Sequence, residues 1–512
     1  MSTNMSMIST SQREQQTGWP RWASDRRIVL ALLALWLLAT MAWRPLLLPD
    51  EGRYAGVARE MMVSGDAWLP TLNGLPYFHK PPLMYWIDIA AMHVFGVNEF
   101  AARFAPFICA WLMGAALYLH LHRHHGARTA AIALAVLASC PGYFIAAQYA
   151  NHDMLVAGLI TLAALCAVRA FEDVNRVARR WLLASWGACA LAVLAKGLIG
   201  FVLPGLVVLP WLLMQRRWRH AVTLLWPPAL VVFVLIAAPW FVQMQRRFPE
   251  FLDYFFVEQH FRRFAQTGFN NVRGAWFYFA VLPLLSLPWI AWLPRLVMQW
   301  RRSGAPSRLA PLYLWWVVAV VGFFSLPASK LVGYVLPAMA PLVALLGVLI
   351  AQGHAWRWVL ALSAAGCVAI VGVLAFQSPN SHRDVALALA ARMQAGDRVA
   401  FIDERFFDIP FYAQLQAPPI VVSRWRDPTI AQNDDWRKEL SDAARFNATR
   451  GAQLLVPDEN VAQLLCGNQV TWIVSGRNFK GQAPWSALAN VPVVFEGRNA
   501  RLMRAAPTQG CP

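Results

Sequence analysis

Charged residues are scarce in this chain of 512 residues. Only 14% of its residues are Asp, Glu, Lys or Arg, whereas 58% are apolar and 25 are tryptophan. A soluble protein of this size would struggle to stay in solution with so few charged side chains on its surface. The composition therefore argues against an ordinary soluble protein and predicts a membrane protein.

Several motifs typical of nucleotide and acyl chemistry are absent. The sequence has no Walker A loop, no glycine fingerprint for dinucleotides and no G-x-S-x-G nucleophile elbow. We therefore expect no nucleotide cofactor. If this protein breaks a bond, we expect the substrate to be a membrane-bound molecule that already carries an activated bond.

Apolar runs that approach the length of a membrane-spanning helix recur as far as about Phe376 and then stop. The first run lies too far into the chain for a cleavable signal peptide, and no small-residue cleavage site follows it. A further run at 82–97 is short and contains Asp88 and His93, so we expect it to lie at the membrane interface. The predicted spans are eleven: 28–48, 104–121, 129–147, 154–170, 182–195, 198–214, 221–242, 275–294, 310–327, 331–350 and 358–376.

Arginine clusters set the predicted orientation of these spans. With a cytoplasmic N-terminus, every inner loop carries arginine, as the positive-inside rule requires. Counting 82–97 as a span would send the clusters at Arg123, Arg179 and Arg216 outward. The run 182–214 would be about 50 Å long as one helix, so we expect a hairpin with Lys196 at its outer tip. Because the net charge of +18 comes from these scattered clusters, no nucleic-acid partner is expected.

The chain is thus divided into a cytoplasmic tail (1–27), a transmembrane domain (28–376) with a large first outer loop (49–103), and an external C-terminal domain (377–512). The last part alternates short apolar runs with helix-like stretches, which predicts a small mixed α/β domain.

Two of the seven cysteines, Cys466 and Cys511, fall in the C-terminal domain. The outer compartment permits a disulfide between them, but spacing alone leaves open whether it forms. The other five cysteines lie in apolar spans, where buried inert thiols are expected.

The outer loops collect the ionisable residues that are least expected for their surroundings. They contain the stretches PDEGRY, YFHKPP, YANHDM, AKG, EQHFRRF and PASKLVGY. The positive-inside rule depletes cations on this side, so their presence there suggests an anionic ligand. These cations are Arg53, Lys80, Lys196, Arg262, Arg263 and Lys330.

Two acids, Asp50 and Asp153, accompany these cations. Each has an ordinary alternative: Asp50 could cap an interfacial helix, and Asp153 could pair with the adjacent His152. Carboxylates from separate loops are also suited to positioning and deprotonating an acceptor or to holding a metal, while nearby cations neutralise a phosphate.

A metal site is a further hypothesis for this side of the membrane. A divalent ion could be held by His79, His260 and a carboxylate, and the alternative is that both are ordinary interfacial histidines. The cluster HRHH at 122–125 belongs to the inner, basic set of loops, so we interpret it as part of the positive-inside pattern.

Several of these motifs, taken together, resemble a known family. The block PDEGRYAGVAREMMVSGDAWLPTLNGLPYFHKPPLMYW, with FGVNEFAARF, NHDMLVAG, LAKGLIGF, VEQHFRRF and FFSLPASKLVGYVLPAMAPL, is similar to bacterial membrane glycosyltransferases of the GT-C fold. The nearest likeness is to the aminoarabinose transferases that modify lipid A, relatives of the protein O-mannosyltransferases. The resemblance covers roughly residues 28–350.

The resemblance implies an inverting transfer of a sugar from a polyprenyl (undecaprenyl) phosphate to an acceptor at the outer side of the cell inner membrane, with the C-terminal domain in the periplasm. The acceptor is lipid A or another envelope component, and membrane lipids surround the protein. By position, Asp50 and Asp153 match the family's acids. The residues that match those near the carrier phosphate are Arg53, Lys80, Lys196, Arg262, Arg263 and Tyr334; further candidates are Glu51, Tyr54, Tyr77 and Lys330.

One departure keeps the acceptor and the metal site open. Where the aminoarabinose transferases typically read Glu-Lys-Pro, this chain reads His79-Lys80-Pro81, which is nearer to the protein mannosyltransferases. A protein O-glycosyltransferase is therefore the alternative within the family. The alternative from another class is a transporter or flippase of a lipid-linked anion. The unusual charges concentrate in outer loops rather than midway through spans, which favours the transferase.

Overall fold

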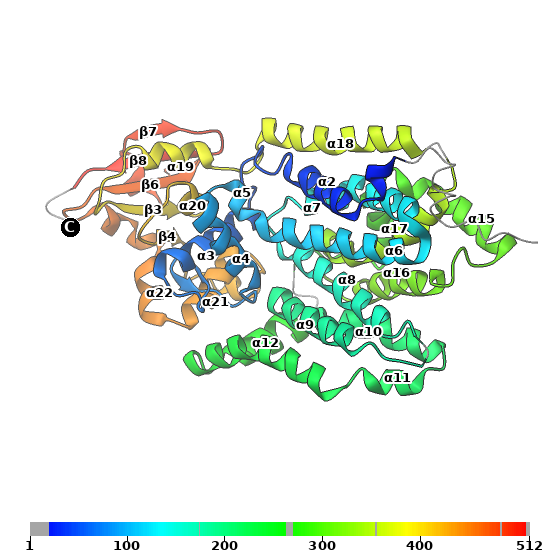
Figure 1. The fold of residues 1–512 in the computed structure, drawn as a ribbon. Helices are drawn as coiled ribbons and strands as arrows, with labels where there is room; N and C mark the ends of the chain where they lie inside the picture. Colours follow the sequence, from blue (N-terminus) through cyan, green and yellow to red (C-terminus); the bar gives the residue numbers. More distant parts are fainter. Residues whose placement is uncertain (1–19, 174, 263–269, 354–355, 482–483, 508–512) are drawn as a thin grey trace, which may run out of the picture.

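The chain folds into two parts arranged along one long axis (Figure 1). The computed structural model describes residues 20–173, 175–262, 270–353, 356–481 and 484–507. Helices form the larger part, and a six-stranded sheet with its helices forms the smaller one. Between them lies the first loop, with α3 (Asp50–Ser64), the hairpin β1 (Thr71–Leu72) and β2 (Leu75–Pro76), and α4 (Leu83–Phe95).

Every predicted span overlaps with one or more helices of the larger part. Five helices among the described residues are by themselves long and apolar enough to cross a membrane, or six if one bent pair counts as a single span. The helical segments are η1 (Arg21–Ser24), α2 (Arg26–Leu38), α5 (Glu99–Ala102), α6 (Phe104–Ser139), α7 (Pro141–Ala146), α8 (His152–Ala170), α9 (Arg179–Lys196), α10 (Ile199–Met214), α11 (Trp218–Thr223), α12 (Pro227–Arg247), η2 (Asp253–Arg262), α14 (Phe277–Leu285), η3 (Trp289–Trp292), α15 (Leu293–Ser303), α16 (Ala310–Ser325), η4 (Val332–Ala338), α17 (Met339–Ile350) and α18 (Trp356–Gln377).

The first and eighth predicted spans are shorter than expected. Helix α2 ends at Leu38 rather than at residue 48, and the chain after it turns inward, so that the side chains of Thr40 and Arg44 are buried. The eighth span is helix α14 followed by a bend of 103° into the segment 289–303. Proline lacks a backbone N–H, and Pro283 lies inside α14 just before this bend.

Glycine divides the second and third predicted spans. Helix α6 covers both, but Gly126 has φ of +81° and interrupts the helical geometry between them. A left-handed backbone conformation of this kind favours glycine, because a Cβ atom would clash there.

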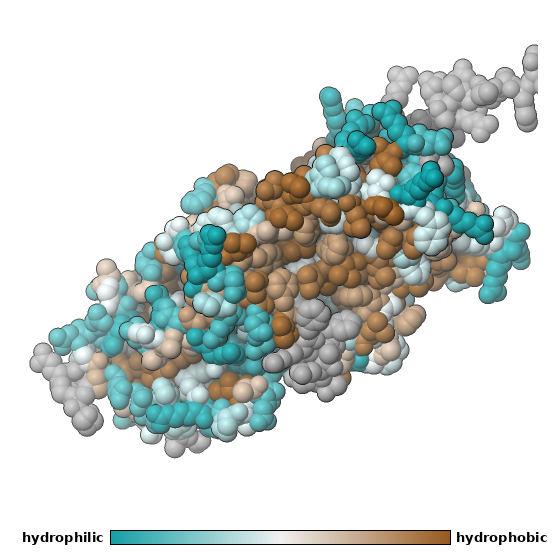
Figure 2. All heavy atoms as spheres, turned by 90° about the horizontal axis from the view of Figure 1, so that it is seen from below, coloured by the Kyte–Doolittle hydropathy of each residue, from teal (hydrophilic) through white to brown (hydrophobic). Residues whose placement is uncertain are grey.

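Apolar side chains cover the middle of the face of the molecule that Figure 2 shows. Figure 2 shows hydrophobic side chains gathered there, with hydrophilic ones towards both ends. In the apolar windows of 218–247 and 356–377, only 11% and 17% of the residues are buried. Apolar helices that bury so little of themselves are suited to lipid contact.

The C-terminal part is built on a mixed sheet with strand order β5-β4-β3-β6-β8-β7. Strands β3 to β6 pair in parallel and β8 pairs antiparallel with both of its neighbours. The strands are β3 (Arg398–Ile402), β4 (Ile420–Ser423), β5 (Leu455–Pro457), β6 (Thr471–Gly476), β7 (Val493–Glu496) and β8 (Ala500–Ala505). The helices are α19 (Arg383–Ala390), α20 (Ile409–Tyr412), α21 (Trp436–Arg445) and α22 (Ala448–Leu454), and three short 3-10 turns are η5 (Pro428–Ala431), η6 (Asp458–Leu465) and η7 (Ser486–Leu488).

Two glycines of α3 let the C-terminal part approach the first loop. A Cβ atom on Gly52 would lie 2.9 Å from the backbone nitrogen of Asp408, and one on Gly56 would lie 3.3 Å from the carbonyl oxygen of Phe407. Positions 52 and 56 are one helical turn apart and therefore share a face of α3. The segment just before α20, residues 407–408, packs on this face of α3.

Candidate functional site

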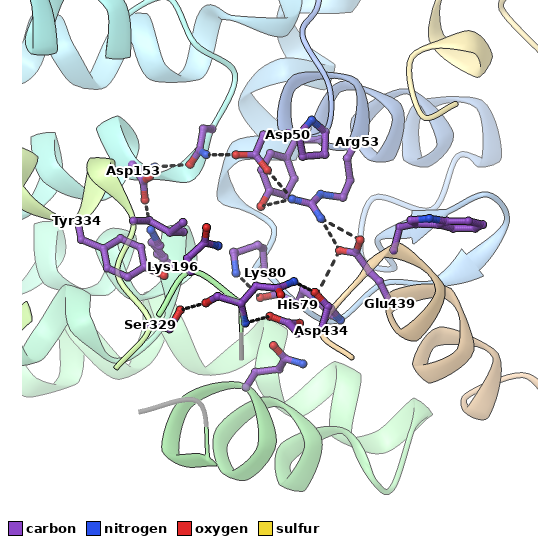
Figure 3. Close-up of a pocket in the computed structure, with 18 of the residues that line it drawn as sticks. Asp50, Arg53, His79, Lys80, Asp153, Lys196, Ser329, Tyr334, Asp434 and Glu439 are labelled. Carbon is purple, nitrogen blue, oxygen red and sulfur yellow. Dashed lines mark hydrogen bonds and ion pairs between the residues drawn. The ribbon is translucent and has the colours of Figure 1, made fainter. Parts of the chain in front are cut away.

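A cavity of about 540 Å³ lies where the first loop, the membrane helices and the C-terminal part meet (Figure 3). Its wall combines charged side chains with apolar ones from Ile199, Phe323, Phe324 and Leu331. Nine residues predicted from the sequence line it: Asp50, Arg53, Tyr54, Tyr77, His79, Lys80, Asp153, Lys196 and Tyr334. The chain thus brings five separate segments of the sequence to one place.

Asp50 stands at the start of α3 and uses both carboxylate oxygens for side chains. Oδ1 accepts a hydrogen bond from Arg53 Nη2 at 2.5 Å, and Oδ2 accepts one from Asn151 Nδ2 at 2.7 Å. Within the described residues its carboxylate accepts no backbone N–H of α3, and Pro49 precedes that helix without a side-chain cap. The alternative in which Asp50 serves only as a helix cap is therefore wrong.

Asp153 faces the same cavity from the start of α8. Its carboxylate forms a close ion pair with Lys196, at the end of α9, and the Lys196 amino group lies 4.4 Å from the centre of the Tyr334 ring. His152 is not its partner, since that ring packs edge-on against Tyr54 instead. The alternative in which Asp153 pairs with the adjacent histidine is therefore wrong. The ion partner of Asp153 is Lys196, at the predicted tip between α9 and α10.

The C-terminal part supplies an acid to this site that the sequence did not indicate. Glu439, on α21, accepts two hydrogen bonds from Arg53 Nη1 at 2.7 and 2.9 Å and one from the Tyr77 hydroxyl at 2.8 Å. Burial lowers the pKa of Arg53, but Glu439 and neighbouring groups outweigh it and raise that pKa well above its ordinary value. Arg53 therefore remains a cation between Asp50 and Glu439.

His79 and Lys80 line the cavity next to Glu439. His79 Nε2 is 2.7 Å from the Tyr254 hydroxyl, and its Nδ1 is 3.4 Å from Glu439 Oε1. The His79 ring also stacks on Tyr77, with ring centres 4.9 Å apart. Lys80 Nζ donates to the carbonyl oxygen of His79 at 3.1 Å.

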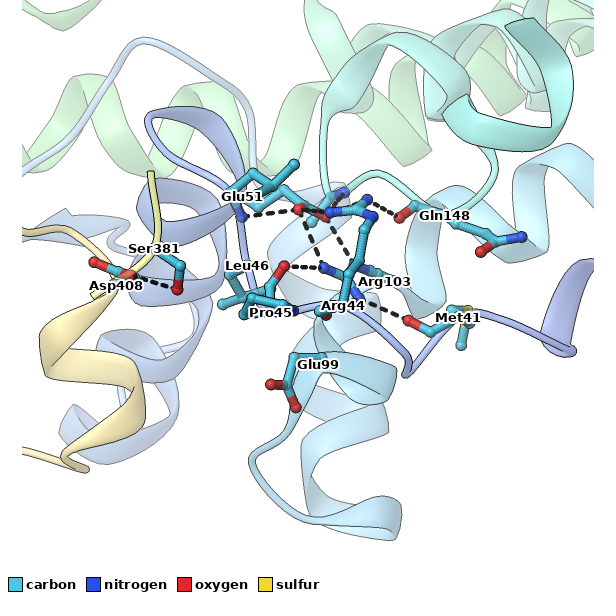
Figure 4. A network of polar contacts seen from close by, with 12 residues as sticks. Met41, Arg44, Pro45, Leu46, Glu51, Glu99, Arg103, Gln148, Ser381 and Asp408 are labelled. Carbon is cyan, nitrogen blue, oxygen red and sulfur yellow. Dashed lines mark hydrogen bonds and ion pairs between the residues drawn. The ribbon is translucent and has the colours of Figure 1, made fainter. Parts of the chain in front are cut away.

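Glu51 does not line the cavity, although it follows Asp50 directly. It lies fully buried between Arg44 and Arg103 (Figure 4). Arg103 Nε donates to Glu51 Oε1 at 2.8 Å, and the backbone N–H groups of Leu47 and Ala150 donate at 3.0 Å each. Burial raises the pKa of Glu51, but Arg103 and Arg44 outweigh it and lower the pKa to about 2. The geometry makes Glu51 the centre of a structural network.

Lys330 also lies apart from the cavity wall. Its amino group donates to the carbonyl oxygen of Arg273 at 2.9 Å and to that of Pro327. These bonds hold the loop before η4 in place.

Three predicted site residues lie outside what the structure describes. Arg263 is not among the described residues, and for His260 and Arg262 only the backbone, at the end of η2, is described. Cys511, the predicted partner of Cys466, is likewise outside the described residues. The five cysteines of the apolar segments are buried free thiols, as expected.

A group with the spacing of metal ligands lies elsewhere in the described part of the chain. Ligand atoms of His120, His124 and Glu172 all lie within 4.8 Å of one another. His120 is about 24 Å along α6 from Phe104, at 1.5 Å per residue. Glu172 also pairs with Arg123 and Arg169. This group is therefore separate from the cavity at the first loop.

The sequence matches known proteins over its first half and beyond. Residues 28–255 match the family described as dolichyl-phosphate-mannose-protein mannosyltransferase. The undecaprenyl phosphate-alpha-4-amino-4-deoxy-L-arabinose arabinosyl transferase of Erwinia tasmaniensis is 35% identical over 318 residues, which are 61% of this chain and 57% of that relative. A second transferase of this description, from Sodalis glossinidius, is 36% identical over 322 residues, 62% of this chain and 58% of the relative. The match therefore spans a little more than half the length of these relatives.

The fold matches solved structures over almost its whole length. ArnT from Cupriavidus metallidurans bound to undecaprenyl phosphate has a TM-score of 0.80, with 24% identity, over 94% of this chain and 99% of that one. The same protein in the apo state has a TM-score of 0.78 over 97% of this chain and all of that one. At this identity the likeness shows the fold alone. It confirms the predicted class, a multi-pass helical membrane protein with a C-terminal mixed α/β domain.

Proposed function

We propose that this chain transfers a sugar from undecaprenyl phosphate to lipid A, because residues 28–255 match the family described as dolichyl-phosphate-mannose-protein mannosyltransferase and the chain is 35% identical to an arabinosyl transferase over 318 residues. The curated relatives are named for the transfer of 4-amino-4-deoxy-L-arabinose, and this is the proposed sugar. The observation that carries the proposal is the cavity in which Asp50, Asp153, Arg53, Lys80 and Lys196 meet.

The cavity has two kinds of wall, as such a donor requires. A carrier phosphate is suited to the cationic side, and a prenyl chain is suited to the apolar side formed by Phe323, Phe324 and Leu331. A departing phosphate is stabilised by positive charge, which Arg53, Lys80 and Lys196 supply. Arg262, Arg263 and Tyr334 remain predicted members of the same binding site.

In the proposed reaction an acceptor oxygen attacks the anomeric carbon from the side opposite the carrier. The bond between that carbon and the phosphate oxygen breaks, the undecaprenyl phosphate leaves as an anion, and the sugar is inverted. Asp50 accepts the proton of an acceptor hydroxyl, or orients an acceptor phosphate that has already lost its proton. Asp153, held by Lys196, is the proposed second acid of the site.

The proposed location is the inner membrane, with the N-terminus in the cytoplasm and the C-terminal domain in the periplasm. This orientation follows from the arginines of the inner loops and puts the cavity on the side where lipid-linked donors and envelope acceptors meet.

A divalent ion is a separate hypothesis about the same cavity. The predicted ligand His79 has its Nδ1 3.4 Å from Glu439 Oε1, a spacing that two ligands of one ion can have. A bound ion there would add positive charge beside Arg53 and Lys80. His260, the other predicted ligand, has no described side chain, and no reaction step is assigned to an ion.

A protein acceptor is the alternative, favoured by the family description and by His79 in the place of the usual glutamate. One experiment separates the two. The purified protein is mixed with the undecaprenyl-linked sugar and either lipid A or an exported acceptor protein, and products are identified by mass spectrometry. We expect transfer to lipid A. Transfer to protein alone would replace this proposal with the alternative, and transfer to neither would contradict the proposed donor.

A further inference from the structure

A second cavity, of about 410 Å³, lies between the first loop and the C-terminal part. The two cavities share no lining residue. Its walls come from the C-terminal half of α3, the hairpin β1–β2, the segment 415–419 and two residues at the start of α22, Asn447 and Arg450. In Figure 1, α3 and α22 lie together at the end of the molecule that carries the sheet. Cavities of a few hundred Å³ are the usual size of small-ligand sites.

Arg59 is the unusual residue of this second cavity. It lines the cavity from α3 and is only 3% exposed. Across the part of the chain that the structure describes, its guanidinium takes part in no hydrogen bond and no ion pair. Burial lowers the pKa of Arg59, and the attraction of the neighbouring Glu60, which raises it, does not outweigh this effect. A buried cation without a hydrogen-bond or ion-pair partner is costly and is rarely kept for packing alone. Arg59 therefore points to an anion that is not part of this chain.

The acids that line the second cavity are already engaged. Glu60 accepts the backbone N–H groups of Asn73 and Gly74 at 2.8 and 2.9 Å. Asp66 pairs with Arg247 at 2.6 Å. Neither carboxylate forms an ion pair with Arg59 among the described residues, so its charge is left available to a ligand.

A second cation faces the same space from the C-terminal part. Arg450 lines the cavity, and its Nη2 lies 3.2 Å from the position that a Cβ atom on Gly74 would take. Gly74 has φ of +76° and closes the hairpin in front of this guanidinium. Each guanidinium group offers the fork of N–H donors that phosphate and carboxylate groups favour, and here two such groups from different parts of the chain line one cavity.

We propose that the second cavity binds a phosphate group of the acceptor glycolipid, other than the group that receives the sugar, through Arg59 and Arg450. The inference rests on the proposed function and specifies its acceptor as a glycolipid with two anionic groups. Asp50 and Arg59 lie nine residues apart on α3, about 13.5 Å along its axis. That separation is suited to an acceptor longer than one sugar ring.

The first test measures thermal stability in the purified full-length protein. Because Arg59 is buried without a partner, Arg59→Gln should keep or raise the Tm in the absence of anions. Inorganic phosphate should raise the Tm of the wild type but not that of Arg59→Gln. Arg477→Gln, at an exposed arginine that lines neither cavity, is the control and should behave like the wild type. A lower Tm for Arg59→Gln without anions would give Arg59 a structural role and overturn the proposal.

The second test measures transfer kinetics with two acceptors. One carries two phosphate groups, and the other lacks the phosphate that does not receive the sugar. For the first acceptor, Arg59→Gln should raise KM by about tenfold or more with little change in kcat, as expected for one lost charge-assisted contact. For the second acceptor, wild type and variant should have the same KM. Equal loss on both acceptors, or no loss on either, would overturn the proposal.

The anionic head group of a bulk phospholipid is the other source of the same chemistry. The Tm is therefore compared in nanodiscs of phosphatidylcholine with and without phosphatidylglycerol. No shift that depends on Arg59 is expected. Such a shift, with an unchanged KM for the two-phosphate acceptor, would assign the cavity to membrane lipid. If the wild type transfers to neither acceptor, the proposed function fails, whereas failure of this inference leaves wild-type transfer intact.

Discussion

Asp50 holds the position in the cavity from which a base could reach the acceptor. Its two oxygens are fixed by Arg53 and Asn151, and its side chain is 26% exposed. Fixed orientation together with access to the cavity is what a general base requires.

We expect Asp50→Asn to reduce transfer by at least about a hundredfold, because an amide cannot accept the proton or carry the charge. Expression, Tm and binding of the undecaprenyl carrier should stay close to those of the wild type, since Asn has nearly the same shape. The measurement is the initial rate with the purified protein. A rate above about a tenth of the wild type would move the role of base elsewhere, with Asp153 the first candidate.

Lys80 gives the cleaner test of the carrier phosphate. Arg53 is only 16% exposed and lies between Asp50 and Glu439, so its removal would also leave two carboxylates without their partner. Lys80→Ala should weaken donor binding or turnover by about ten- to a hundredfold, the loss of a charge-assisted contact of about 1.5 to 3 kcal/mol. Donor kinetics equal to those of the wild type, in a folded variant, would remove Lys80 from the site.

Glu51 directly follows Asp50, but we expect its replacement to affect stability rather than transfer. Glu51→Gln should destabilise the protein by about 3 to 5 kcal/mol, since it leaves the Arg44 and Arg103 guanidiniums buried without a compensating charge. Denaturant unfolding in detergent measures this loss, with Glu404→Gln at an exposed position as control. A variant of Glu51 that unfolds like the wild type but has lost transfer would instead place Glu51 in the site.

Among the elements, helix α3 contributes to both cavities and also contacts the C-terminal part. Its first turn carries Asp50 and Arg53, Gly52 and Gly56 receive the C-terminal part, and its last turns reach the second cavity. A Cβ atom on Gly52 would lie 2.6 Å from Leu48 Cδ2.

Gly52→Ala should therefore push α3 away from the C-terminal part and destabilise the protein by about 1 to 3 kcal/mol, the usual cost of overpacking. Gly205→Ala is the control, because nothing lies within 4 Å of a Cβ atom there. The Tm of both variants measures the difference. Equal Tm values for the two would show that the contact between α3 and residue 408 is loose.

The hairpin β1–β2 is joined to α3 through Glu60, and burial raises the pKa of that carboxyl group to about 7. Between about pH 4.5 and 7 the folded protein binds more protons at Glu60 than the unfolded chain does. The contribution of Glu60 to stability is therefore complete below about pH 4.5 and is lost as the pH rises through 7. We expect Tm to fall from pH 5 to pH 8 more steeply in the wild type than in Glu60→Gln, and parallel curves would contradict this.

For the whole molecule, the sequence predicted the multi-pass helical fold and the mixed C-terminal domain, because long apolar runs and strand-like alternation are local signals. The motifs around Asp50, Lys80 and Asp153 also predicted a common site. Glu439 could not be predicted, since a charged residue on an amphipathic helix looks like ordinary surface. Glu51 was misjudged for a related reason: adjacent residues on a helix point in different directions, and only tertiary packing decides which one faces the cavity.

The orientation of the molecule remains a prediction that reporter fusions can test. A fusion after Arg123 should report the cytoplasm, and one in the C-terminal domain should report the periplasm, since arginine clusters mark the inner loops. An external location for the fusion after Arg123 would mean that the predicted orientation of every later segment is wrong.

The bond between Arg53 and Glu439 joins residues that are 386 positions apart. At a synthesis rate of about 5 to 20 residues per second, the arginine leaves the ribosome about 20 to 80 seconds before its partner. Throughout that interval the nascent first loop holds Arg53 and Tyr77 without the carboxylate that orders them. The cavity is therefore assembled only when the last quarter of the chain has been made and has reached the same side of the membrane, so that an incomplete chain carries the motifs of the first loop without a complete cavity.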